Sequence, residues 1–298
     1  MEQLKQLLTA AGIAYKENEP LAAHCTFKIG GPARLFVQPV DHAQLCRAVA
    51  LCKAQGVRYY LLGNGSNILF ADEGYNGAVL DISSMQDTVE VHGTQLTAGA
   101  GVRLSALCKT ALEHSLTGLE FAYGIPGTVG GAVYMNAGAY GGEMKDVLTT
   151  VQYLTAEGEV KEAAAAELDL RYRHSIFEEN GGCILSAQFA LTPGEPEVIR
   201  AKMDELMAKR LDKQPLDKPS AGSTFKRPMG AFAAALIDQC GLRGYRHGGA
   251  AVSEKHCGFV VNLGGATCAD VLALCEEVRT IVKEKTGYDL EKEIRVVR

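Results

Sequence analysis

Residues 118–142 read GLEFAYGIPGTVGGAVYMNAGAYGG, and this stretch guides the interpretation of the whole chain. Apolar residues such as Ile125, Val129 and Val133 alternate with its glycines, whereas a flexible linker would be polar there. Because so many glycines weaken a helix or strand, we expect a tightly bent, buried segment. Its backbone N–H groups would suit a diphosphate. The alternative is a glycine-rich bend that only turns the chain inside a core, because isolated glycine motifs often match by accident.

A second glycine loop lies upstream and changes the balance between these two interpretations. Residues 63–67 read Gly-Asn-Gly-Ser-Asn and follow a short apolar strand pattern over residues 57–62. No helical pattern follows, so this is not a Rossmann fingerprint, and the absence of Gly-Lys-Ser/Thr excludes a P-loop. Its residues tolerate positive φ and add hydrogen-bonding side chains. Taken alone, the loop is better explained as a hairpin turn.

Composition restricts the class of protein. The chain has 298 residues, of which 47% are hydrophobic and 22% charged, with a net charge of −5. This length favours about two domains with a sizeable core. The net charge offers no general attraction for nucleic acid or an anionic membrane. No stretch approaches the ~18 apolar residues that span a bilayer, and the N-terminus lacks the apolar core of a signal peptide. We expect a cytoplasmic protein without membrane insertion.

The cysteines favour a reducing compartment and give no indication of a metal site. There are nine, an odd number, and none forms a Cys-x-x-Cys pair. Most lie among apolar residues, which is typical of reduced core thiols. His247, His256 and Cys257 lack standard zinc spacing, so we expect no metal.

Periodicity predicts an α+β chain with a boundary near Pro193. An Asp41–Gln44 capping box begins one helix, and a hairpin over 148–160 turns near Gly158. The other predicted elements, each with a helical or strand pattern, are helices around 4–11, 104–112, 199–207, 232–240 and 271–282 and strands at 35–38, 78–82, 89–92, 96–99, 183–191, 258–263 and 291–298. A basic loop is predicted after Lys209-Arg210, with Lys213, Lys218, Lys226 and Arg227.

Several motifs, taken in order, resemble those of one enzyme family. They are Thr26–Arg34, Gly63–Asn67, Gly124–Gly131, Asn136–Gly141, Arg171–Phe177, Pro219–Phe225 and Glu293–Val296. Together they cover nearly the whole chain and resemble the UDP-N-acetylenolpyruvoylglucosamine reductases, flavoenzymes of bacterial peptidoglycan synthesis. The resemblance implies an FAD-binding fold of the vanillyl-alcohol-oxidase/cresol-methylhydroxylase (PCMH) type over residues 1–193, made of two α+β subdomains. It also implies a substrate-binding domain over 194–298, whose last strand returns towards the flavin.

The resemblance assigns both glycine loops to FAD. The first loop has no histidine, which implies a non-covalent flavin, and no tyrosine-bearing insertion is recognisable, which implies the shorter type of the family. The implied cofactor-binding residues are Gly63, Asn64, Gly65, Ser66, Asn67, Gly124, Ile125, Pro126, Gly127, Thr128, Gly130, Gly131, Asn136, Gly138, Ala139 and Tyr140.

The resemblance also implies the reaction, in which NADPH reduces FAD and hydride then passes to an enolpyruvyl ether. The implied catalytic residues are Arg173 and Glu293, which stabilise the enol, and Ser223, which donates the proton. Lys213, Lys226 and Arg227 are the implied ligands of the UDP-sugar. Without the family, Arg173 would be interpreted as a surface arginine, Ser223 as a loop serine and Glu293 as a solvated charge. We expect a monomer that binds UDP-sugar and NADPH.

Two other functions stay open at this point. One is an oxidase of the same flavin fold that uses oxygen as acceptor. The histidine-free first loop and the Ser223–Glu293 pair argue against it. The other is a non-catalytic nucleotide-sugar sensor, against which the presence of all three catalytic candidates argues.

Overall fold

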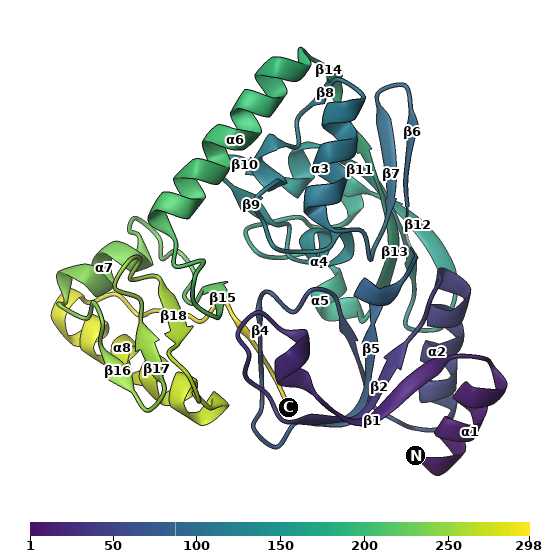
Figure 1. Ribbon diagram of the computed structural model, residues 1–298, viewed down its shortest axis with the longest axis horizontal. Helices are drawn as coiled ribbons and strands as arrows, with labels where there is room; N and C mark the ends of the chain where they lie inside the picture. The colour runs from purple at the N-terminus through teal and green to yellow at the C-terminus, as the bar shows by residue number, and fades with distance from the viewer. Residues whose placement is uncertain (87) are drawn as a thin grey trace. The chain divides into compact units, whose positions relative to one another are not determined.

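The computed structural model describes residues 1–86 and 88–298, and contacts within it group the chain into two compact units (Figure 1). Unit 1 comprises Met1–Lys16, Leu35–Asn64 and Gly77–Arg210, and unit 2 comprises Glu17–Arg34, Gly65–Asn76 and Leu211–Arg298. The predicted boundary at 193/194 divides the chain in sequence, whereas each unit gathers three segments in space. That boundary stays a prediction.

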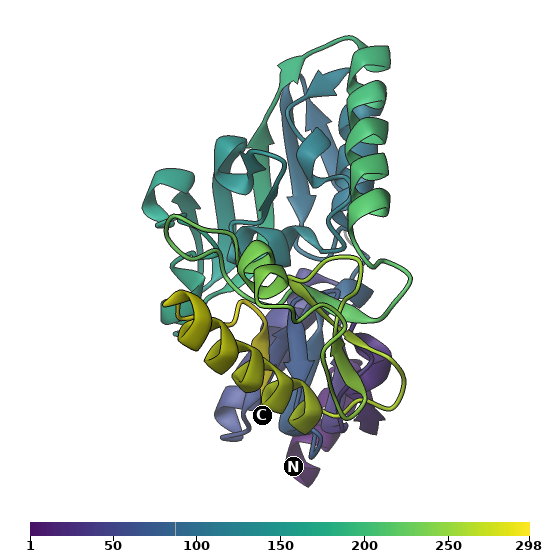
Figure 2. The ribbon, with the colours of Figure 1, turned by 90° about the vertical axis from the view of Figure 1, so that its left-hand side faces the viewer.

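The largest sheet of unit 1 has five strands in the order β12-β11-β13-β7-β6, all antiparallel to their neighbours. Its strands are β6 (Val89–His92), β7 (Gln95–Gly99), β11 (Leu148–Leu154), β12 (Val160–Ala164) and β13 (Cys183–Ala190). The helices around it are α3 (Leu104–Glu113), α4 (Val129–Tyr134), α5 (Phe177–Asn180) and α6 (Pro196–Lys213). α4 packs on β13 and β7, and the long α6 is the green helix in Figure 2.

A second sheet has the order β1-β2-β5-β3, and α1 (Glu2–Ala10) packs against α2 (His42–Ala54) beside it. Its strands are β1 (Ala14–Pro20), β2 (Pro32–Gln38), β3 (Tyr59–Leu62) and β5 (Tyr75–Asp81). The predicted start of α2 is confirmed, because the Asp41 carboxylate accepts the N–H of Gln44 at 2.7 Å. β3 runs parallel to β5, and the first glycine loop begins directly after it.

Unit 2 contains a four-stranded antiparallel sheet in the order β15-β18-β17-β16. The 19-residue helix α8 (Cys268–Thr286) packs on β16 and β17 and also contacts α7 (Ala233–Gln239). The strands are β15 (Ser220–Ser223), β16 (Arg246–His247), β17 (Ala250–Val252) and β18 (Phe259–Asn262). A separate parallel pair joins β4 (Ile68–Phe70) to β19 (Arg295–Val297), so the end of the chain lies beside the segment that follows the first glycine loop.

The α+β class is confirmed, but three elements differ from the sequence-based expectation. The glycine stretch contains a helix, α4, because tertiary contacts compensate for the low helix propensity of Gly130 and Gly131. α6 continues to Lys213, so the predicted basic loop begins later than expected. The last strand is shorter than the predicted 291–298, because β4, its pairing partner, has only three residues. The remaining strands are short pairs: β8 (Leu116–Thr117) with β14 (Thr192–Pro193), and β9 (Gly138–Ala139) with β10 (Gly142–Glu143).

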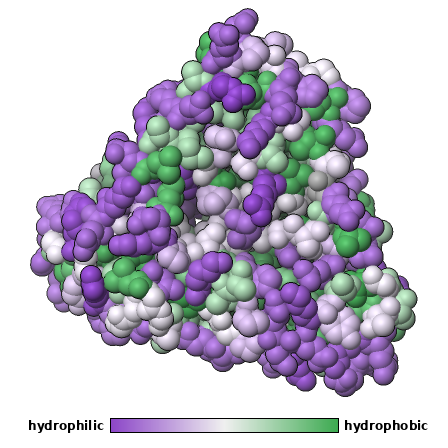
Figure 3. Space-filling model, in the orientation of Figure 1, coloured by the Kyte–Doolittle hydropathy of each residue, from purple (hydrophilic) through white to green (hydrophobic). Residues whose placement is uncertain are grey.

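The surface is mixed in polarity. On the face shown in Figure 3, hydrophilic residues predominate and hydrophobic ones form small patches between them. In the described ranges, no helix combines the length and apolar character needed to cross a membrane.

The start of α8 is capped by a residue far away in sequence, and this contact yields a testable prediction. The Asp72 carboxylate accepts the N–H of Cys268 at 2.7 Å and that of Ala269 at 3.0 Å. A carboxylate at a helix N-terminus satisfies unpaired donors and complements the helix dipole. Replacing Asp72 with alanine should therefore lower the free energy of unfolding by about 1–2 kcal/mol, as measured by urea denaturation.

The neighbouring exposed Glu73 provides the control for this prediction. Glu73→Ala should leave the unfolding midpoint close to that of the wild type, because it removes a charge of the same sign without removing the cap. Equal midpoints for Asp72→Ala and Glu73→Ala would contradict the capping role.

Candidate functional site

The two glycine loops touch each other within unit 1. A Cβ atom on Gly63 would lie 2.6 Å from the hydroxyl oxygen of Thr128, which no side chain tolerates without movement. One residue on, the Asn64 amide donates a hydrogen bond of 2.8 Å to the carbonyl of Pro126. The first loop is therefore fixed to the start of α4 by a close backbone approach and one side-chain bond.

The backbone N–H groups at the start of α4 are already used by the protein. Val129 donates to the carbonyl of Val102 at 2.8 Å, and Gly130 donates to that of Ala100 at 2.9 Å. The N–H of Gly131 is capped by the Thr128 hydroxyl at 3.4 Å. The expectation that this stretch presents bare N–H groups is therefore wrong for residues 129–131. These glycines allow close packing, since a Cβ on Gly130 would lie 2.9 Å from that of Ala100.

The first loop provides unsatisfied donors instead. The N–H groups of Asn64, Gly65 and Ser66 have no hydrogen-bond partner in the part of the chain that the structure describes. All three residues are at least half-buried, and Gly65 has a φ of +60°. Successive N–H groups beside a left-handed residue form a concave cluster of donors that suits an anionic or carbonyl oxygen.

Gly124–Gly127 forms the approach to α4. Ile125 donates its N–H to the carbonyl of Ala122 at 3.0 Å, and Gly127 donates to that of Ile125 at 2.9 Å. Gly124 faces α6, where the Cδ of Arg210 lies 3.0 Å from its hypothetical Cβ. No sequence motif singles out Arg210, although helical spacing places it on the face of α6 that carries Ile199, Met203 and Leu206.

Asn136 has a structural environment. It is 1% exposed, with a φ of +39°. Its amide group donates to the Glu143 carboxylate at 2.8 Å and to the Arg171 carbonyl at 3.1 Å. Its side-chain oxygen accepts the N–H of Lys145 at 3.0 Å. The hydrogen-bonding groups of the Asn136 side chain are thus used by protein partners. Through these bonds, Asn136 holds the glycine stretch to the segment that carries Arg171.

Arg173 lies against the hairpin formed by β9 and β10. Its guanidinium donates to the carbonyl of Gly138 at 3.4 Å and stacks 5.1 Å from the ring centroid of Tyr172. Arg173 has a φ of +55°, and Tyr140, in the hairpin turn that follows Ala139, has a φ of +54°. Such conformations cost about 1 kcal/mol or more for residues other than glycine, and they cluster at functional sites. Unit 1 therefore brings Arg173 next to the predicted cofactor stretch.

Unit 2 brings together the other two predicted catalytic segments. The N–H of Glu293 donates to the carbonyl of Thr224 at 2.8 Å, directly after Ser223 at the end of β15. The Asn67 amide donates to the Glu293 carbonyl at 3.3 Å. Ser66 also lies close, because its carbonyl oxygen is 4.0 Å from the hypothetical Cβ of Gly222. Ser223, Glu293 and the end of the first glycine loop are thus neighbours.

The predicted substrate cations have different environments. Lys213 is exposed at the last residue of α6, whereas Lys226 forms an ion pair with Glu291 at 2.5 Å. The guanidinium of Arg227 stacks over the Phe232 ring at 4.4 Å. Lys213 has no ion pair or side-chain hydrogen bond within the described residues, whereas Lys226 is already paired.

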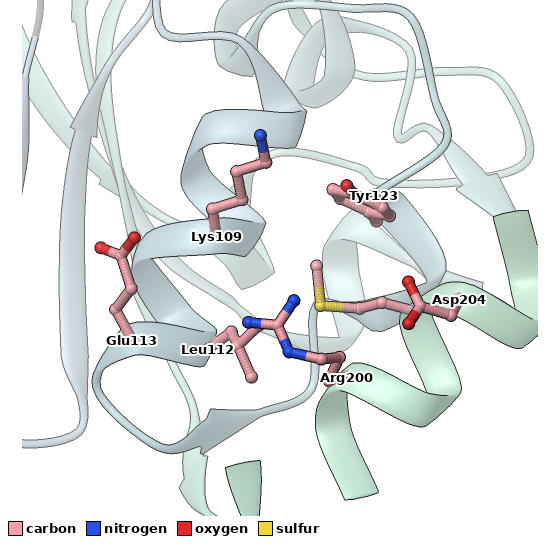
Figure 4. A pocket seen from close by; sticks show the side chains of 7 residues that line it. Lys109, Leu112, Glu113, Tyr123, Arg200 and Asp204 are labelled. Atoms are coloured by element: carbon pink, nitrogen blue, oxygen red, sulfur yellow. The ribbon is translucent and has the colours of Figure 1, made fainter. Parts of the chain in front are cut away.

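A pocket of about 170 Å³ lies between α3 and α6 (Figure 4). It is much smaller than the ~300–1,000 Å³ of typical ligand sites. Four exposed charged side chains and three less polar ones line it: Lys109, Leu112, Glu113, Tyr123, Arg200, Met203 and Asp204. Its small volume and mixed charges do not match a dinucleotide.

The cysteines and histidines do not form a reactive centre in the described ranges. All nine cysteines are free, and no group of three or more His, Cys, Asp or Glu side chains could hold a metal ion. The Cys257 thiol contacts the Asp238 carboxylate at 3.5 Å. Burial raises the pKa of Cys257 to about 11, so this thiol stays protonated at neutral pH.

Comparisons with known proteins agree with this arrangement. A family model described as "FAD binding domain" matches residues 33–164, and one described as "UDP-N-acetylenolpyruvoylglucosamine reductase, C-terminal domain" matches residues 214–297. The reductase of Agathobacter rectalis is 49% identical, with 99% of this chain and 96% of the relative covered. That of Lachnoclostridium phytofermentans is 47% identical, covering 100% and 96%.

A solved structure gives the same result. The crystal structure of UDP-N-acetylenolpyruvylglucosamine reductase from Thermus caldophilus matches with a TM-score of 0.81 and 34% identity, covering 96% of this chain and 99% of that one. The predicted FAD-binding flavoprotein fold and the predicted family are therefore confirmed: this chain belongs to the UDP-N-acetylenolpyruvoylglucosamine reductase family.

Proposed function

We propose that this protein uses FAD and NADPH to reduce UDP-N-acetyl-3-O-(1-carboxyvinyl)-glucosamine to UDP-N-acetylmuramate, a step of peptidoglycan precursor synthesis. The family supports an oxidoreductase with an FAD-binding domain. The structural observation that carries the proposal is the direct link between the Ser223 and Glu293 segments through the Thr224 carbonyl. The cytoplasmic location, the monomeric state and the preference for NADPH stay predictions.

The first glycine loop fits a flavin nucleotide. The unsatisfied N–H groups of Asn64, Gly65 and Ser66 would bind phosphate or flavin carbonyl oxygens. We assign Gly63 and the start of α4 to shaping the backbone around these donors rather than to hydrogen bonding. Bound FAD would supply hydride transfer between NADPH and the enolpyruvyl double bond.

Three side chains would stabilise the negative charge that develops on the substrate and supply its proton. Arg173 would hold the carboxylate with its planar guanidinium and stabilise the negative charge that develops beside it. Glu293 would stabilise the enol. The Ser223 hydroxyl would donate one proton to the carbanion carbon, a role that a weak acid can fill because the acceptor is strongly basic. Lys213, with Lys226 and Arg227, would bind the diphosphate.

A spectroscopic experiment tests the proposed function. The purified protein should be yellow, anaerobic NADPH should bleach the flavin absorbance, and the enolpyruvyl UDP-sugar should restore it. Reoxidation by oxygen but not by the UDP-sugar would favour an oxidase. A protein that releases no flavin on denaturation would overturn the proposal.

Ser223→Ala should separate the two halves of the reaction. Bleaching by NADPH should keep its rate, whereas reoxidation by the UDP-sugar should slow by about 10²–10⁴-fold, as is typical for loss of a general acid. Stopped-flow absorbance measures both rates. Ser220→Ala on the same strand is the matched control and should leave both rates unchanged. Normal reoxidation by Ser223→Ala would exclude the proton-donor role.

Arg173→Ala should lower kcat by about 10²–10³-fold, the usual effect of losing one donor to a developing oxyanion. The neighbouring Arg171, whose guanidinium pairs with Asp169 at 2.6 Å, provides the control. Arg171→Ala should retain most of the activity under steady-state conditions. A loss of less than twofold in Arg173→Ala would remove Arg173 from the site.

A further inference from the structure

Arg210 is a charged residue on the inward face of α6, and the proposed mechanism gives it no role. Ile199, Met203 and Leu206 of this helix are buried, and Arg210 follows them at the spacing of one helical face. Position 210 continues a face that is otherwise apolar, so a hydrophobic residue would be expected there. A guanidinium there needs a physical explanation.

The stem of Arg210 packs on the glycine stretch. A Cβ atom added to Gly124 would lie 3.0 Å from the Cδ of Arg210 and 3.7 Å from the Cε of Met207. Gly124 thus allows α6 to approach the backbone just before α4. The guanidinium is thereby placed beside the predicted cofactor stretch within unit 1.

The charge of Arg210 has no counterpart among the residues that the structure describes. Across residues 1–86 and 88–298, its guanidinium has no ion pair and no side-chain hydrogen bond. Burial lowers the pKa of Arg210, and the nearby phenol of Tyr140 acts in the opposite direction. Arginine nevertheless stays protonated in proteins. A cation that is partly removed from water without a partner is strongly unfavourable, unless an anion of a ligand compensates for it.

We propose that Arg210 binds an anionic oxygen of a nucleotide diphosphate, carried either by FAD or by the UDP-sugar. This inference rests on the proposed function. The observations that favour it are the position against Gly124, the proximity to Tyr140 and the absence of a protein partner in the described ranges. A guanidinium suits this task because its planar donors match phosphate geometry and keep their charge.

The test compares ligand affinity with the stability of the ligand-free protein. Arg210→Met keeps the length of the side chain but removes the charge, and Arg210→Lys keeps a charge without the planar fork. Arg200→Met is the matched control, because Arg200 is exposed on the same helix. FAD affinity is measured by fluorescence on adding FAD to flavin-free protein. Affinity for UDP, as the probe of the substrate diphosphate, is measured by calorimetry on the flavin-loaded protein.

We expect Arg210→Met to weaken FAD or UDP by about fivefold or more, in line with the loss of a charge-assisted hydrogen bond. The ligand that weakens identifies the source of the diphosphate. Arg210→Lys should lose less, and Arg200→Met should change neither affinity. The Tm of ligand-free Arg210→Met should equal or exceed that of the wild type, because an uncompensated charge has been replaced by an apolar group.

Two results would overturn the inference. One is a change of less than about fivefold in both affinities. The other is an affinity loss accompanied by a clearly lower Tm, or a failure of Arg210→Met to fold, since a residue needed only for packing would lose both together. Wild-type protein that binds no FAD would instead contradict the proposed function, so the two failures can be told apart.

Discussion

The contact between Gly63 and Thr128 is the constraint on which the arrangement of unit 1 depends. No side chain fits at position 63, because a Cβ there would lie 2.6 Å from the Thr128 hydroxyl. The same hydroxyl caps α4 by accepting the N–H of Gly131. One threonine therefore contacts the first residue of the first glycine loop and also caps the start of α4, the α-helix of the glycine stretch. The N–H groups of Asn64, Gly65 and Ser66, which follow Gly63, have no hydrogen-bond partner within residues 1–86 and 88–298.

A second set of contacts connects the glycine stretch to the segment that carries Arg173. Asn136 follows α4 and holds the Arg171 carbonyl, while the buried Ser175 hydroxyl donates to the Tyr134 carbonyl at 2.7 Å. Both bonds flank Arg173, so its left-handed backbone is determined by its surroundings. Strain at a functional residue persists only when neighbouring contacts specify the conformation in this way. The glycine stretch thus serves the predicted catalytic arginine through hydrogen bonds on either side of it.

The sequence predicted regular elements well where local chemistry determines them. The Asp41 cap and the hairpin at Gly158 were correct, because capping geometry and turn residues act over a few positions. The helix within the glycine stretch was missed, because contacts such as that between Gly130 and Ala100 stabilise it from outside. The family resemblance implied roles for both Ser223 and Glu293. Only the folded chain shows the bond between their segments through Thr224, next to an isolated antiparallel bridge between Phe225 and Lys292. The burial of Arg210 could not be predicted from the sequence, because it depends on how α6 packs.

The pairing of β4 with β19 constrains how the chain folds during synthesis. The Asn67 amide and the Glu293 carbonyl that it binds are 226 residues apart. A ribosome adding about 5–20 residues per second would expose β4 for many seconds before its partner strand emerges. During that time the backbone groups along the edge of β4 are unpaired. Side chains that are fully buried in the native state, such as Phe70, are then exposed to solvent. Completion of unit 2 is therefore a late, long-range closure, and premature termination near the C-terminus would leave an aggregation-prone strand.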